Sequence, residues 1–154
     1  MVGARFIVAA AAILVGTSAV VAGDVIKPDD VKVTKDLAVN DSLTGKPGDP
    51  KAGRKTFVNK KLGNCLACHA NKEMSDQQFH GEVGPPLDGV ASRYKPEQLR
   101  AIVINSKSVF GPDTVMPGFY SLKVGKHVRK DLVGKTILTA AQVEDVVAYL
   151  STLK

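Results

Sequence analysis

The chain has no tryptophan, and aromatic residues make up only 5% of its 154 residues. Aromatic side chains usually contribute much of the buried area of a protein core, so a core built from this polypeptide alone would be modest. The excess of basic residues could suggest nucleic acid as a partner, but no basic stretch is interleaved with aromatic residues that could stack on bases. An acidic protein partner, or simple solubility, explains the charge better.

Potential metal and sulfur ligands are also scarce, with two cysteines and three histidines in the whole chain. A zinc site needs further ligands at metal-binding spacing, whereas His80 and His127 are isolated from each other and from any second cysteine pair. A disulfide across two intervening residues would be strained and would add little stability. A thioredoxin-like dithiol would need a strand–helix context. The sequence therefore argues against all three kinds of site.

Both cysteines lie in one motif, Cys65-Leu66-Ala67-Cys68-His69. C-x-x-C-H is the attachment sequence of c-type haem. Each thiol can add to one vinyl group, and the imidazole that follows then lies under the iron as the proximal ligand. We therefore predict one covalently attached haem c, bound by Cys65 and Cys68 and ligated by His69. This haem would use every thiol of the chain and would supply apolar volume to the core.

The first 22 residues have the composition of an export signal. Arg5 is their one charged residue, an apolar run extends from Phe6 to Val15, and small residues end the segment at Ala22. A retained anchor is the alternative, but an apolar stretch of about 17 residues is at the short limit for a membrane span. We predict a signal peptide over residues 1–22 and a periplasmic mature protein with no membrane span after cleavage.

The mature chain would have about 130 residues, enough for one compact domain. Residues 23–49 are rich in proline, glycine, aspartate and lysine and show no sustained period, which predicts an irregular N-terminal arm. Its sparse apolar residues leave open whether the arm lies on the domain or on a partner. Residues 50–154 would then form the domain that holds the haem.

Three helices are expected in this domain. Asp49-Pro50 supplies a capping carboxylate and a proline suited to a first helical turn, followed by a basic helix over Lys51–Lys61. A second helix is expected over Pro96–Asn105. The last helix begins with the capping-box pattern T-x-x-Q at Thr139 and reaches Leu150, with apolar residues at helical spacing.

The first and last helices carry residues suited to a close crossing. Gly53 would allow the two backbones to approach each other, with Phe57 and Tyr149 as packing partners. Turn-rich loops are expected over residues 70–94 and 106–138. The predicted fold is an all-α domain in which helices and long loops surround one haem.

A low-spin haem iron needs a sixth ligand, and the candidates are Met74, His80, Met116 and His127. Met74 follows His69 too closely to reach the opposite face of the haem easily, and the two histidines lie in polar, loop-like segments. Met116 lies in a loop rich in proline and glycine that can hold the backbone over the iron. In this setting we favour Met116 as the axial ligand over a role as a core filler. A thioether favours Fe(II), so this ligation would raise the potential and suit electron acceptance.

Three more residues are candidates for contacts around the haem. The Pro85 carbonyl, in the turn cluster Gly84–Gly89, is well suited to accept a hydrogen bond from Nδ1–H of His69. An ordinary turn is the alternative for this cluster. Arg93 is a candidate anchor for a propionate, or else a surface cation, and Thr114 could also bond a propionate.

Taken together, these residues resemble class I cytochrome c over most of residues 50–154. A narrower resemblance is to the family of X subunits of the SoxAX cytochrome, from the thiosulfate-oxidising Sox system. The long methionine loop, Phe110 to Tyr120, is its most specific part. The other matching segments are 63–69, 84–90, 93–94, 134–135 and 138–150.

The narrower resemblance implies a heterodimer with a haem-bearing SoxA-like subunit. It implies that the complex, an L-cysteine S-thiosulfotransferase, joins thiosulfate oxidatively to a cysteine of a carrier protein and releases two electrons. The X subunit would accept electrons and pass them to a small cytochrome c. This chain has no free thiol and Met116 would close the iron to substrate, so we predict a non-catalytic electron-transfer subunit.

Two other classes of protein remain open from the sequence. A freestanding periplasmic electron shuttle would share every haem feature and is the main alternative. A ligand-binding or sensor cytochrome would lack methionine ligation. The basic residues of segment 123–135 could guide an acidic partner, although a solvated face explains them better.

Overall fold

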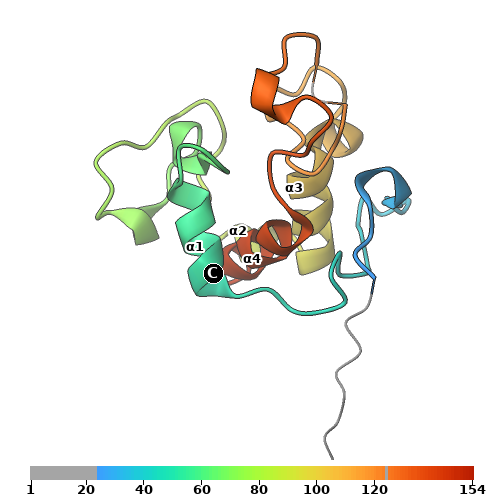
Figure 1. The fold of residues 1–154 in the computed structure, drawn as a ribbon. Helices are drawn as coiled ribbons and strands as arrows, with labels where there is room; N and C mark the ends of the chain where they lie inside the picture. Colours follow the sequence, from blue (N-terminus) through green and yellow to red (C-terminus); the bar gives the residue numbers. More distant parts are fainter. Residues whose placement is uncertain (1–23, 124) are drawn as a thin grey trace, which may run out of the picture.

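The computed structural model describes residues 24–123 and 125–154 (Figure 1). The predicted signal peptide, residues 1–22, lies outside the described residues. In the part that is described, all regular structure is helical, which confirms the predicted all-α class. No helix there has both the length and the apolar character needed to cross a bilayer. The α-helices are α1 (Pro50–Val58), α2 (Val90–Arg93), α3 (Pro96–Phe110) and α4 (Ala140–Leu150), and the short 3-10 helices are η1 (Pro28–Asp30), η2 (Cys65–Ala67), η3 (Lys72–Met74) and η4 (Lys130–Leu132).

Helices α1 and α4 cross at close range, as the sequence predicts. A Cβ atom on Gly53 of α1 would lie 1.9 Å from the carbonyl oxygen of Asp145 in α4, so a side chain at this position would force the helices apart. Beside this contact the rings of Phe57 and Tyr149 meet edge to face, with centroids 5.4 Å apart. Both rings are buried. The crossing fixes the place from which the haem motif starts.

The helix starts follow the predicted caps. Asp49 accepts a hydrogen bond from the backbone N–H of Lys51 through Oδ1, at 2.8 Å. At the start of α4, Gln142 N–H donates to Thr139 Oγ1 at 3.2 Å, and Thr139 N–H donates to Gln142 Oε1 at 2.9 Å. These two bonds complete a capping box.

Two helix ends differ from the prediction. Helix α1 stops at Val58, earlier than the predicted Lys61, because Asn59 is extended (φ −71, ψ 113) and its side chain accepts from Lys61 N–H at 2.9 Å. Helix α3 extends to Phe110, past the predicted end at Asn105, but Asn105 itself has non-helical angles (φ −157, ψ 92). The predicted boundary therefore coincides with a break within the helix.

The N-terminal arm lies on the domain, one of the two locations that the sequence left open. It packs beside α3 and then runs to the start of α1 (Figure 1). Val39 and Leu43 are buried in the core. A backbone bond fastens the arm to α3, because Val39 N–H donates to the Glu97 carbonyl at 2.9 Å. Within the arm, Ile26 N–H donates to the Leu43 carbonyl at 2.9 Å.

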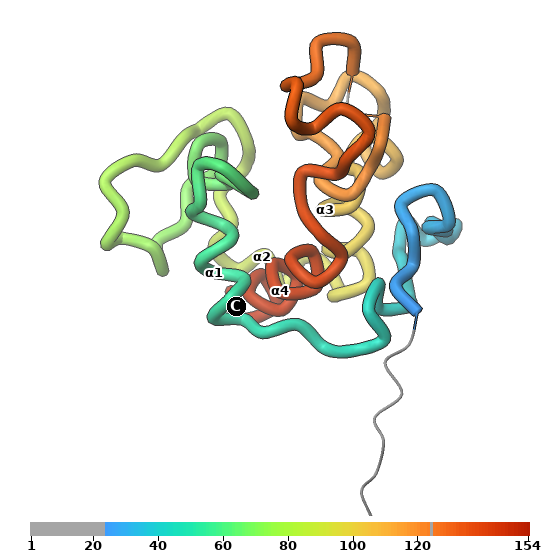
Figure 2. The backbone as a smooth tube through the Cα atoms, in the orientation of Figure 1, coloured from blue at the N-terminus to red at the C-terminus, as the bar shows by residue number. Residues whose placement is uncertain are grey.

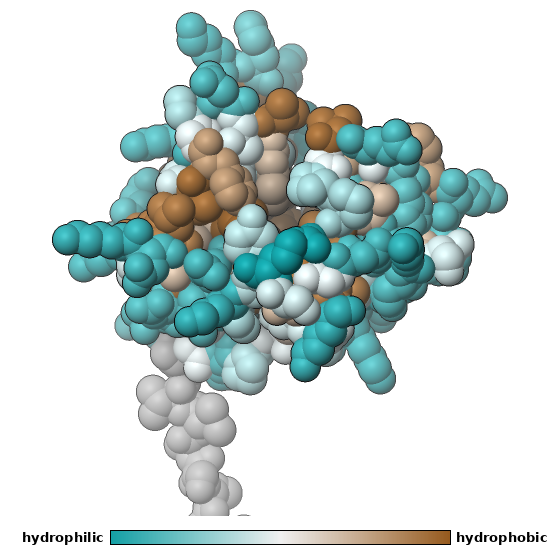
Figure 3. Space-filling model, turned by 180° about the vertical axis from the view of Figure 1, so that it is seen from behind, coloured by the Kyte–Doolittle hydropathy of each residue, from teal (hydrophilic) through white to brown (hydrophobic). Residues whose placement is uncertain are grey.

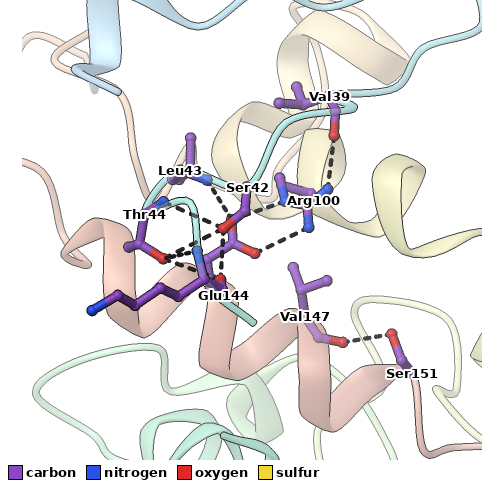
Figure 4. Close-up of polar contacts among 9 residues, drawn as sticks. Val39, Ser42, Leu43, Thr44, Arg100, Glu144, Val147 and Ser151 are labelled. Carbon is purple, nitrogen blue, oxygen red and sulfur yellow. Dashed lines mark hydrogen bonds and ion pairs between the residues drawn. The ribbon is translucent and has the colours of Figure 1, made fainter. Parts of the chain in front are cut away.

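A buried ion pair joins the arm to both long helices (Figure 4). Arg100 of α3 and Glu144 of α4 form two parallel bonds, Nε to Oε1 at 2.8 Å and Nη2 to Oε2 at 3.0 Å. Arg100 also donates to the Val39 carbonyl at 2.8 Å, and Glu144 accepts from Leu43 N–H at 2.9 Å. The exposed fractions of Arg100 and Glu144 are 8% and 3%, so this node is shielded from water.

Two long segments leave this helical frame and stand on opposite sides of it. Residues 59–89 extend beyond α1, and residues 111–123 and 125–139 extend beyond α3, with α4 between them (Figures 1 and 2). The first segment carries the C-x-x-C-H motif, and the second carries Met116. The fold thus places the two predicted iron ligands, His69 and Met116, on two separate long segments.

Candidate haem site

The C-x-x-C-H motif forms a tight helical turn after α1. Asn64 has left-handed backbone angles (φ 47, ψ 36), and η2 follows directly. The N–H groups of Cys68 and His69 both donate to the Cys65 carbonyl, at 3.1 and 3.0 Å. In a 3-10 turn, side chains three residues apart lie one above the other, so the two thiols face the same way. Burial raises the pKa of the Cys65 thiol to about 12, which favours the neutral thiol.

The ring of His69 is oriented by the turn that follows the motif. Its Nδ1 atom lies 2.8 Å from the Pro85 carbonyl oxygen. A carbonyl only accepts, so Nδ1 carries the proton and Nε2 keeps a free lone pair. Gly84 allows this approach, because a Cβ there would lie 2.3 Å from His69 Cε1. His69 therefore offers the ring nitrogen and tautomer that a metal ligand needs.

Arg93 holds the same turn in place. Its Nη1 donates to the Asp88 carbonyl and its Nη2 to the Pro86 carbonyl, both at 2.8 Å. The sequence suggested a propionate anchor or a surface cation, and the structure adds a third role as a brace of the Pro85 turn. Because a guanidinium has five N–H donors, the two backbone bonds leave donors for a propionate.

Met116 lies half-buried in the loop after α3 and packs against the core. Its carbonyl oxygen accepts from Ser106 Oγ at 2.6 Å. The ammonium group of Lys107 donates to the carbonyl of Pro112 at 3.2 Å and to that of Thr114. The loop that presents Met116 is thus tied to the end of α3.

The other candidate ligands have different surroundings. Met74 is fully buried in the core on η3. His80 uses both ring nitrogens, because Nδ1 accepts from Asn71 N–H at 3.1 Å and Nε2 donates to the Met74 carbonyl at 3.1 Å. His127 is exposed in the segment after the methionine loop. Met116 therefore stays the predicted sixth ligand.

A polar cluster behind the motif was missed by sequence reasoning. The side chain of Asn71, fully buried, donates to Tyr149 Oη at 2.8 Å and accepts from Glu73 N–H at 3.1 Å. Tyr149 in turn donates to the Glu73 carboxylate. The pKa of Tyr149 is raised, mainly by burial and then by the hydrogen bond to Glu73. The cluster ties the chain just after His69 to α4, yet an asparagine near a turn gives no sequence signal of such a role.

Exposed apolar side chains on the two long segments suit contact with a porphyrin. Phe79 and Val83 of the first segment are 69% and 71% exposed, and Val115 of the second is 78% exposed. Apolar side chains gather on one part of the face seen in Figure 3, with polar side chains around them. The donor set of two aligned thiols and a histidine with free Nε2 fits a c-type haem.

Comparison with known proteins agrees with this site. A family model described as Cytochrome c matches residues 50–154. The chain therefore belongs to the cytochrome c family. It is an electron-transfer protein with one covalently bound haem c, attached at the motif of Cys65 and Cys68.

Among solved structures, the chain is similar to the crystal structure of SoxXA from P. pantotrophus. The two chains are 41% identical, with a TM-score of 0.76, and the match covers 83% of this chain and 97% of that one. The predicted resemblance to SoxX is thereby confirmed. The c-type cytochrome SorU from Sinorhizobium meliloti is 27% identical over 68% of this chain and 88% of that one, with a TM-score of 0.43. A search of curated proteins gave no match.

Proposed function

We propose that this chain is the electron-transfer subunit of a periplasmic SoxXA-type complex that oxidises thiosulfate. The observation that carries the proposal is the similarity to SoxXA, which extends over nearly all of that chain. In the proposed reaction, a sulfur atom of thiosulfate and the thiol of a carrier-protein cysteine join in an S–S bond. That step releases the thiol proton to water and two electrons; this chain accepts the electrons one at a time and passes each to a small cytochrome c.

The residues of this chain suit transfer of electrons better than sulfur chemistry. Both cysteines belong to the attachment motif, so no thiol remains to take part in an S–S bond. The cysteine that carries the sulfur must therefore lie on another polypeptide. The complex would supply it through the SoxA-like subunit or the carrier protein.

Each site residue has a proposed role. Cys65 and Cys68 hold the haem, which supplies a one-electron Fe(III)/Fe(II) couple. His69 would ligate the iron through Nε2, and its bond to the Pro85 carbonyl fixes the ring and its tautomer. Met116 would be the second ligand, a soft thioether that would raise the potential and exclude substrate from the iron. Arg93 and Thr114 are the proposed propionate contacts.

Purification of the tagged chain from its source organism tests this function. After growth on thiosulfate, we expect it to be recovered with a haem-bearing SoxA-like subunit in equal amounts, with its N-terminus near residue 23. The control for unspecific binding is the same tagged chain purified from cells that were grown without thiosulfate. Recovery of the chain as a lone monomer would contradict the proposal and favour a freestanding shuttle.

A further inference from the structure

We propose that Ser106 and Lys107, at the break in α3, are positioning residues that keep the thioether of Met116 on the iron. The proposal rests on the ligation of iron by Met116 proposed above. It adds the part of the protein that controls this ligand, which lies in α3 rather than in the loop itself. Because Phe110 belongs to α3 in the structure, the methionine loop is here residues 111–120.

The break in α3 creates a binding edge for one end of the methionine loop. Because Asn105 is extended, the carbonyls of the preceding turn are open to other donors. Phe119 N–H donates to the Val103 carbonyl at 3.2 Å, and Tyr120 N–H donates to the Ile104 carbonyl at 3.1 Å. The backbone that follows Met116 is therefore hydrogen-bonded to α3.

Gly118 makes this close approach possible. A Cβ atom at position 118 would lie 3.1 Å from Oδ1 of Asn105 and 3.2 Å from the Ile104 carbonyl oxygen. Both distances are tighter than ordinary van der Waals contact. The glycine two residues after Met116 thus lets the loop lie directly against the break.

The two residues after the break hold the other end of the loop. Ser106 is fully buried, and its hydroxyl donates to the carbonyl of Met116 itself, at 2.6 Å. Lys107 donates to the carbonyls of Pro112 and Thr114, which precede Met116 in the chain. Consecutive side chains of α3 therefore bind the loop before and at the ligand, while backbone groups bind it after the ligand.

These bonds have a direct consequence for ligation. The hydrogen bond from the buried Ser106 hydroxyl to the Met116 carbonyl fixes the backbone from which the thioether extends, and its loss removes this constraint. The thioether binds Fe(III) more weakly than Fe(II), so a loosened loop should release Met116 first in the oxidised state. Lys107 is exposed, and water can replace its bonds, so its effect should be smaller than that of Ser106.

The test uses the holoprotein with Ser106→Ala, and measures imidazole binding to the oxidised form, the midpoint potential and the near-infrared methionine-to-iron band. Loss of one buried hydrogen bond should raise the imidazole association rate about tenfold, weaken the band and lower the potential. Lys107→Gln should change all three quantities in the same direction by smaller amounts. Lys107→Arg keeps the positive charge and N–H donors and should behave like the wild type. Lys107 is exposed, so its variants give the same readouts if Ser106→Ala does not accumulate.

Ser151→Ala is the matched control. Ser151 follows α4, and its Oγ donates to the Val147 carbonyl at 2.7 Å, also a bond from a serine hydroxyl to a backbone carbonyl but away from the loop. This variant should lower stability without changing imidazole binding, band or potential. If Ser106→Ala and Lys107→Gln behave like Ser151→Ala while Met116→Ala abolishes the band, the positioning role is refuted and Met116 ligation stands. If Met116→Ala keeps the band, both the ligand and its positioning residues are wrong.

Discussion

Replacing Glu144 by glutamine should strongly destabilise the domain. The substitution keeps the shape of the side chain and an oxygen that can accept from Leu43 N–H. It removes the negative charge that faces the guanidinium of Arg100, whose two bonds to Glu144 are 2.8 and 3.0 Å long. Arg100 would then be a buried cation without a counter-charge. The variant therefore isolates the contribution of charge at the point where arm, α3 and α4 meet.

The expected loss follows from the burial of the pair. Removing one partner of a buried ion pair costs about 3–5 kcal/mol, because the other charge stays out of water. Glutamine still offers hydrogen bonds, so we expect the lower end of that range. For a domain of about 130 residues, each kcal/mol shifts the midpoint of thermal unfolding by roughly 3–4 °C. The holoprotein should therefore unfold about 10 °C lower.

Thermal and denaturant unfolding of the holoprotein, followed by circular dichroism, measures this loss. A double-mutant cycle with Arg100→Met separates the charge effect from the other losses, because the double variant contains no unpaired charge at this position. It leaves the Val39 carbonyl without its partner, at a cost of about 1–3 kcal/mol, while the glutamine amide oxygen can still accept from Leu43 N–H. The double variant should thus be less destabilised than the sum of the single variants. A loss below about 0.5 kcal/mol for Glu144→Gln would refute the reasoning.

Three further substitutions test the site. Met116→Ala should open the sixth coordination position, lower the potential and allow rapid CO binding by the reduced protein; an unchanged spectrum would show that Met116 is not the ligand. Gly84→Ala should reduce the yield of holoprotein and change the potential, because its Cβ would lie 2.3 Å from His69 Cε1, and a variant with wild-type haem content and potential would contradict the packing. Tyr149→Phe should flatten the alkaline loss of stability. The raised pKa of Tyr149 means that the unfolded phenol ionises from about pH 10 while the folded one stays neutral, so stability falls as pH rises above 10. Equal pH slopes for the two proteins, from unfolding titrations, would argue against this.

Features carried by local sequence were predictable. The spacing of Cys65, Cys68 and His69 specifies its own chemistry, and the T-x-x-Q pattern at Thr139 specifies a helix start through bonds within one turn. The crossing of α1 and α4 could be predicted from Gly53 because a glycine within a helix needs a packing reason. In each case one short segment contains the whole signal.

Features that need several distant segments were not predictable. Arg100 and Glu144 are 44 residues apart, and each alone looks like an ordinary surface charge. Their burial depends on the arm, whose sparse apolar residues did not decide where it lies. The sequence placed a helix end at Asn105 but did not show that the helix resumes there, because the donors that stabilise the break come from Phe119 and Tyr120. The residues that hold the methionine loop could therefore be found only in the folded structure.

The most direct test of the proposed function is whether electrons from thiosulfate reach the haem of this chain. The fully oxidised complex of this chain with the SoxA-like subunit would be mixed with carrier protein and thiosulfate. Rapid absorbance measurements would then follow the reduction of this haem. We expect the haem to be reduced as the S–S bond forms on the carrier cysteine, and to be reoxidised when a small cytochrome c is added. Complete modification of the carrier while this haem stays oxidised would contradict the proposal.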